Sequence, residues 1–184
     1  MNKQNNEQKI QEELATISAE ENNEKEDISQ YKGLGGWLIL VIIGLFSMVA
    51  MEVYYFFESI ALFKDDTIRA FIDYSGALGN LFKIEMVVGI LFLIFAIYLI
   101  LLFFQKSKKF PKYYIILLVA SVIWPILEYI IWFSLPVDSN EFRQIINETL
   151  SEEVPEIGRG IITMFVWGLY MIKSKRVKAT FIEK

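Results

Sequence analysis

The chain has no cysteine and no histidine, and each absence removes a class of chemistry. Without cysteine it has no disulfide, no thiol nucleophile and no thiolate ligand for a metal. Without histidine it has no Ser-His catalytic pair, no imidazole proton relay and no imidazole-bound metal. A net charge of −4 argues against a nucleic-acid partner. The sequence therefore predicts no metal site, no cofactor and no nucleic-acid partner.

Long apolar runs are what the sequence has in excess, since hydrophobic residues make up 54% of its 184 positions. Four runs are predicted as membrane spans, at about residues 37–57, 84–104, 113–135 and 154–172. A bilayer core needs about 20 helical residues, and the first three runs reach that length while being apolar on all sides. The fourth is weaker, because Glu156 and Arg159 lie in its first turns. The predicted fold is all-α, a polytopic four-helix transmembrane bundle.

The distribution of lysine and arginine predicts the orientation, because cytoplasmic connections are enriched in both. With a cytoplasmic N-terminus, thirteen of the eighteen basic residues fall on the inner side. The outer side then holds Lys64, Arg69, Lys83, Arg143 and Arg159. We expect both termini in the cytoplasm, with an acidic flexible tail at residues 1–30 and a membrane domain at residues 31–182.

The two outer connections are long, and both contain apolar residues among charged ones. Phe142, Ile145, Ile146 and Leu150 follow a spacing close to i, i+3, i+4 and i+8, which suits an amphipathic helix. Such a helix would lie on the outer leaflet or cap the bundle. A solvated loop with one packed face is an equally good interpretation, so we expect these connections to be partly helical.

Two motifs at opposite ends of the membrane region carry a resemblance. The first is Gly35-Gly36-Trp37-Leu38, at the entry to the first span. The second begins at Trp167 and Tyr170 and continues through Ser174 to Phe181, in the pattern W-x-x-Y-x-x-x-S-x-R-V-K-x-T-F. Together they resemble the bacterial membrane family called domain of unknown function 2569, over about residues 31–182. The resemblance implies an integral inner-membrane protein and implies no activity.

The residues of these motifs also have a physical interpretation. Trp37 suits the membrane interface. Lys173, Lys175, Arg176 and Lys178 leave the last span where anionic lipid headgroups would attract them, although plain retention of positive charge in the cytoplasm explains them as well. Charge does not explain Thr180 and Phe181, which would re-enter the interface or dock on the basic loop between the second and third spans.

Charges inside spans are costly and therefore mark candidate sites. Glu52 and Glu128 each lie 15 residues beyond the inner start of their span, about 22 Å deep at 1.5 Å per residue. A predicted outer polar cluster collects the ionisable residues of all four spans: Glu52, Lys83, Glu85, Glu128, Glu156 and Arg159. Three interpretations stay open. The carboxylates are satisfied structurally by Arg159, Lys83 or tyrosine hydroxyls, or they form an outward vestibule for a cation, a proton or a basic small molecule, or they contact another membrane protein.

The sequence contains no phosphate-binding loop, nucleophile elbow or metal-ligand spacing. We therefore predict a protein that is not an enzyme. The first hypothesis is an accessory or interaction protein of the membrane, which would contact the lipid bilayer and either a membrane protein partner or a second copy of the chain. The alternative is a small transporter, or a ligand or cation sensor, that uses the outward-facing Glu/Arg cluster.

Overall fold

The computed structural model describes residues 14–16, 31, 33–62, 64, 66, 69, 76–134 and 140–182. Four long helices form most of this part of the chain: α2 (Trp37–Leu62), α4 (Gly76–Phe104), α5 (Phe110–Ser134) and α6 (Asn140–Lys173). Within the described ranges there is no β-strand, so the predicted all-α class is confirmed. The tail at residues 1–30, apart from residues 14–16, and most of the first outer connection lie outside these ranges.

Three of the helices are long and apolar enough to cross a membrane, at Trp37–Ala61, Gly79–Phe104 and Phe110–Ser134. Their outer surfaces keep large apolar side chains exposed; Phe133, for example, is 68% exposed. A water-soluble protein rarely exposes contiguous apolar surface on this scale, whereas lipid is a favourable environment for it. These helices fit a membrane protein.

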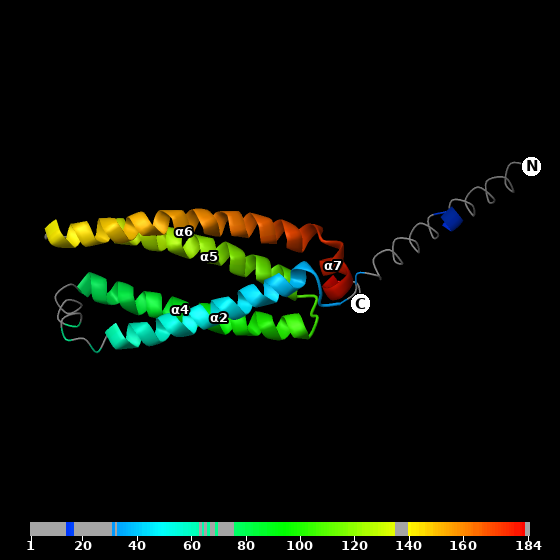
Figure 1. Ribbon diagram of the computed structural model, residues 1–184, viewed down its shortest axis with the longest axis horizontal. Helices are drawn as coiled ribbons and strands as arrows, with labels where there is room; N and C mark the ends of the chain where they lie inside the picture. Colours follow the sequence, from blue (N-terminus) through cyan, green and yellow to red (C-terminus); the bar gives the residue numbers. More distant parts are fainter. Residues whose placement is uncertain are drawn as a thin grey trace, which may run out of the picture.

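The long helices pack as two antiparallel hairpins. In the first, α2 lies along α4, and in the second, α5 lies along α6, whereas contacts between α4 and α5 are fewer. Figure 1 shows that the hairpins approach each other at the end marked by α7 and separate toward the opposite end. A turn that contains Lys106, whose φ is +49°, joins the two hairpins at the α7 end. The two hairpins therefore meet at one end and diverge toward the other.

The main hydrophobic core lies at the closed end. Each long helix contributes to it, with α2 supplying Leu38 and Val41, α4 supplying Phe103, α5 supplying Phe110 and α6 supplying Met171, all of them almost completely buried. Because these residues come from both hairpins, burying them holds the two hairpins together.

The chain continues past α6 into a segment that we call the clasp, residues 174–182. It begins at Ser174, whose side chain caps α7 (Lys175–Val177) by accepting a hydrogen bond from the Val177 amide. A π-helix, η1 (Lys178–Ile182), follows. Phe181 in this segment is fully buried and stacks on Phe110, with ring centroids 4.8 Å apart. Of the two predicted placements of Phe181, the structure has the one against the loop between the second and third predicted spans.

Helix α6 joins two segments that the sequence predicts as separate: the second outer connection and the fourth span. The amphipathic segment with Ile146 and Leu150 is helical and both residues are buried, but the helix runs on through Pro155 into the predicted fourth span. Its 34 residues extend about 51 Å at 1.5 Å per residue. That length exceeds the thickness of a bilayer core, about 30 Å.

Candidate functional site: an acidic cavity between the hairpins

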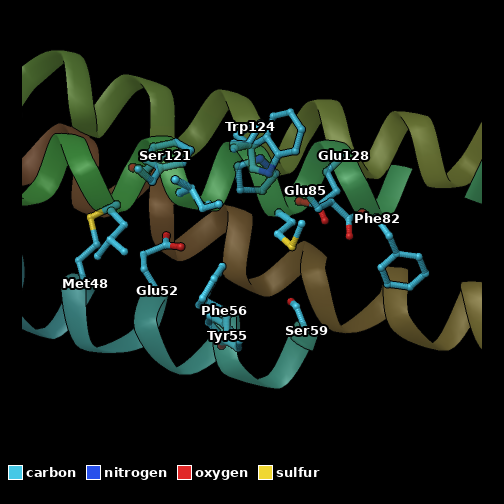
Figure 2. Close-up of a pocket in the computed structure, with 17 residues that line it drawn as sticks. Met48, Glu52, Tyr55, Phe56, Ser59, Phe82, Glu85, Ser121, Trp124 and Glu128 are labelled. Atoms are coloured by element: carbon cyan, nitrogen blue, oxygen red, sulfur yellow. The ribbon is translucent and has the colours of Figure 1, made fainter. Parts of the chain in front are cut away.

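A cavity of about 390 Å³ lies where the hairpins separate, bounded by α2, α4 and α5. Each of these helices contributes one carboxylic side chain to the lining: Glu52 from α2, Glu85 from α4 and Glu128 from α5. Aromatic side chains form much of the remaining wall, and Figure 2 shows Phe56, Phe82 and Trp124 around it. Among the described residues that line the cavity, none is basic. We call it the acidic cavity.

Glu85 and Glu128 are neighbours across the α4–α5 contact. Figure 2 shows their carboxyl groups directed toward each other. The Trp132 indole N–H donates to Glu85 Oε1 at 3.1 Å. The Phe82 ring contacts Trp132 edge to face, with centroids 6.2 Å apart, and so fixes the position of the donor. This hydrogen bond holds the Glu85 carboxyl group beside Glu128.

Glu52 approaches the cavity from α2, the other helix of the first hairpin. Figure 2 shows the Glu52 carboxyl group directed into the cavity from α2, on the Ser121 side of the Glu85–Glu128 pair. It fits against α4 because the facing residue is Gly89, where a Cβ atom would lie 3.3 Å from Glu52 Oε2. A side chain larger than glycine at position 89 would force the Glu52 carboxyl group to move.

The other members of the predicted polar cluster lie outside the acidic cavity. Lys83 is exposed on α4, and Glu156 and Arg159 form an ion pair one turn apart on the exposed surface of α6. In the described structure Arg159 pairs with Glu156, at the i, i+3 spacing of one helix, and not with Glu52 or Glu128. Three of the six predicted residues share the cavity, and none of these three is basic.

Glu153 adds a fourth acidic group near the pair, from α6. Its Oε2 atom is buried and has no hydrogen-bond partner within the described structure. Burial raises the pKa of the Glu153 carboxyl above its ordinary value, and the nearby Glu128 raises this pKa further. Acidic groups thus gather on this side of the molecule, and the described residues of the cavity wall include no basic side chain.

The residues predicted for the lipid interface divide into two kinds. Lys173, Lys175 and Lys178 are exposed, and Trp37 is 62% exposed with its ring against that of Trp167. Arg176 is half-buried and packs on the protein itself: its guanidinium lies 3.2 Å from where a Cβ on Gly35 would be. The Arg176 side chain therefore packs at the junction between the clasp and the chain that leads into α2.

The arrangement suits non-covalent binding better than catalysis. The cavity volume falls within the usual range of roughly 300–1,000 Å³ for small-molecule sites. Among the described residues, no three carboxylates come close enough together to hold a metal ion. Carboxyl groups beside aromatic rings attract an organic cation, through charge and through the negative faces of the rings.

Sequence reasoning missed Trp124, Trp132 and Gly89 as parts of the site. An indole N–H near an in-span carboxylate, as at Trp132, is a natural hydrogen-bond donor. Gly89 is a lone glycine in a long apolar run, and it could have signalled a close approach from a neighbouring helix.

Comparison with known proteins places the chain in a family. Residues 31–182 match the family described as Protein of unknown function (DUF2569). The chain belongs to this family. The match confirms the predicted resemblance and covers all four long helices and the clasp. No curated protein and no solved structure matches the chain. Family membership and the apolar helices together fit a membrane protein, and the family description assigns no activity.

Proposed function

We propose that this protein is a non-enzymatic, multi-pass protein of the bacterial inner membrane that binds a small organic cation in the acidic cavity. The cavity would open toward the outer side, and both termini would lie in the cytoplasm. The observation that carries the proposal is the Glu85–Glu128 pair in a ligand-sized, aromatic-walled cavity whose described lining residues include no basic one.

Four spans are part of the proposal, with the C-terminal half of α6 as the fourth. This half exposes large apolar side chains, among them Ile162 at 66% and Phe165 at 59%. It also packs along α5, which is itself long and apolar enough to cross a membrane. Lipid would cover this surface, whereas water would not. With this topology, the exposed lysines of the clasp would face anionic headgroups of the inner leaflet.

The cation proposal follows from the charges around the cavity. Three carboxyl groups line it, and the basic residues predicted to neutralise them lie elsewhere. Cavity walls of low polarity strengthen the attraction of a carboxylate for a cation. A cation that also contacts aromatic rings gains further energy from their faces, with Trp124, Tyr55 and Phe56 available in the wall.

Equilibrium binding of radiolabelled tetramethylammonium to the purified protein in nanodiscs tests this proposal, with empty nanodiscs as the blank. We expect saturable binding that Glu128→Gln and Glu85→Gln each weaken at least about tenfold, since each removes a charge next to the ligand. The matched control is Glu156→Gln, which removes a carboxylate outside the cavity and should leave the affinity unchanged. Absence of saturable binding, or equal loss in the control, would contradict the proposal.

An accessory role in the membrane is the competing proposal, in which a partner's helix would place a basic side chain in the acidic cavity. It predicts no binding of the free cation, and loss of a co-purifying membrane protein in the Glu128→Gln variant but not in Glu156→Gln. If the cation binds, its uptake into proteoliposomes then separates a transporter from a sensor, because only a transporter moves the cation across the membrane.

A further inference from the structure

A second hollow adjoins the acidic cavity and has the opposite character. It is a groove of about 490 Å³ between α4 and α5, and every described residue that lines it is apolar. It shares three residues with the acidic cavity: Val88, Phe92 and Trp124. A ligand could therefore occupy both hollows at once, with Trp124 at their junction.

The groove faces outward from the protein. Ile116 and Ile123 in its wall are 45% and 50% exposed, and both lie within the α5 segment that is long and apolar enough to cross a membrane. Lipid chains therefore surround this surface in a bilayer. The groove is thus accessible from the hydrocarbon layer, whereas the acidic cavity supplies polar groups.

The direction of the groove matches the direction of a lipid chain. Along α5 it extends from Ile115 to Leu127, about 18 Å at 1.5 Å per residue. Glu128 follows directly after Leu127, so the carboxyl pair lies at one end of the groove and the rest of the groove extends toward the α7 end. The Trp124 side chain belongs to both hollows, because it lines the acidic cavity and also the groove.

We propose that the ligand is a single-chain amphiphile with an ammonium head, held with its head in the acidic cavity and its alkyl chain in the groove between α4 and α5. This inference rests on the proposed function, since it assumes that the acidic cavity binds a cation. The ligand would enter sideways from the outer leaflet, in the orientation that it already has there, with its head outermost.

Charge complementarity favours such an amphiphile over a phospholipid. The phosphate of a phospholipid would lie close to the ammonium group and face the same carboxyl groups. Among the residues that line the two hollows, there is no lysine or arginine to bind that phosphate. A head that carries positive charge alone suits this lining.

The test compares a compact cation with its long-chain relative, tetramethylammonium with decyltrimethylammonium, on the protein in nanodiscs of phosphatidylglycerol. Ala120 lines the groove but not the acidic cavity, so Ala120→Phe would fill the groove and leave the carboxyl pair intact. The matched control is Ala50→Phe, the same substitution at an exposed position of α2 that lines neither hollow. The lipid is the same for all variants, so partitioning of the long chain into the bilayer cancels between them.

We expect Ala120→Phe to weaken decyltrimethylammonium binding at least about tenfold and to change tetramethylammonium binding less than about twofold. Ala50→Phe should change neither. If Ala120→Phe also lowers the yield of folded protein, Ala120→Leu provides a smaller obstruction. It should likewise weaken decyltrimethylammonium binding more than tetramethylammonium binding.

Two other outcomes separate the inference from the function on which it rests. If the long-chain cation binds equally well to Ala120→Phe and wild type, while the compact cation still depends on Glu128, the inference is wrong and the proposed function stands. If neither cation binds saturably to the wild-type protein, the proposed function fails and the inference fails with it. If replacing phosphatidylglycerol by phosphatidylethanolamine abolishes the difference in long-chain binding between wild type and Ala120→Phe, a lipid headgroup occupies the site, which would also overturn the inference.

Discussion

Thr180 and Gly33 lie 147 positions apart and are joined by two hydrogen bonds. The Thr180 Oγ1 atom accepts from the Gly33 amide at 3.2 Å and donates to the Gly33 carbonyl at 3.1 Å. Gly33 has a φ of +126°, which side chains rarely allow, so the backbone that Thr180 contacts requires glycine. The clasp after the last long helix is therefore fixed directly to the chain just before the first one.

Removing the Thr180 hydroxyl should loosen this junction. Thr180 is 3% exposed, and Thr180→Val keeps its shape while leaving the Gly33 amide and carbonyl without their partner. We expect a loss of about 1–3 kcal/mol in the free energy of unfolding, measured by titration with sodium dodecyl sulfate in mixed micelles. Thr180→Ser should restore most of it. The control is Thr163→Val on the exposed surface of α6, and a loss of similar size there would count against the explanation.

Phe181 should matter more than Thr180, because its ring forms part of the main core. It is fully buried and packs against both Phe110 and Phe103, at centroid distances of 4.8 and 5.7 Å. Phe181→Ala should therefore cost about 3–5 kcal/mol in the same unfolding assay, with the loss reduced in Phe181→Leu. Phe165→Ala removes an equally large side chain that is 59% exposed, and it should cost much less. Equal losses in the two alanine variants would show that Phe181 does not hold the hairpins together.

The hydropathy of the sequence is sufficient to predict the helices, but not how each helix is rotated about its own axis. An apolar run specifies that a segment is helical and how deep each residue lies, because the rise per residue is constant. It does not specify which neighbour a residue faces. Glu52 and Glu128 were therefore grouped by depth, whereas the structure brings Glu128 next to Glu85, on the helix that directly precedes α5 in the chain.

Other parts of the site were within reach of sequence reasoning. The i, i+3 spacing on one helix predicts the Glu156–Arg159 ion pair. Such a local pair is favoured over an ion pair between Arg159 and another helix. By contrast, the Trp132–Glu85 hydrogen bond joins residues 47 positions apart on different helices. No local pattern encodes such a contact, since it depends on how α4 and α5 are rotated against each other.

Stability should depend on pH through Glu153, which lies outside the proposed fourth span. Burial and the neighbouring Glu128 raise the pKa of its carboxyl from the ordinary value of 4.5, so ionisation disfavours the folded state. The free-energy cost of ionising Glu153 in the folded state is absent at pH values below 4.5. This cost grows as the pH rises through the pKa that Glu153 has in the folded state. Glu153→Gln removes it, so the variant should unfold at a higher temperature than wild type at neutral pH and at nearly the same temperature at about pH 4.

Thermal unfolding of the detergent-solubilised protein across this pH range measures the effect of Glu153→Gln. The adjacent Glu152→Gln is the control, because Glu152 is exposed and its substitution removes the same formal charge. A gain that is constant across pH, or equal in the two variants, would exclude the burial of Glu153 as the cause.

The proposed topology can be tested with single cysteines, because the natural chain has none to remove. Lys108→Cys lies in the turn between α4 and α5, and Ser151→Cys lies in the first half of α6; both positions are exposed. In intact cells a membrane-impermeant maleimide should label Ser151→Cys, and it should label Lys108→Cys only after lysis. Lys173→Cys tests the fourth span. If α6 crosses the membrane, the maleimide should label Lys173→Cys only after lysis, as it does Lys108→Cys. Labelling of Lys173→Cys in intact cells, with Lys108→Cys still protected, would reduce the spans to three and place the clasp outside the cell.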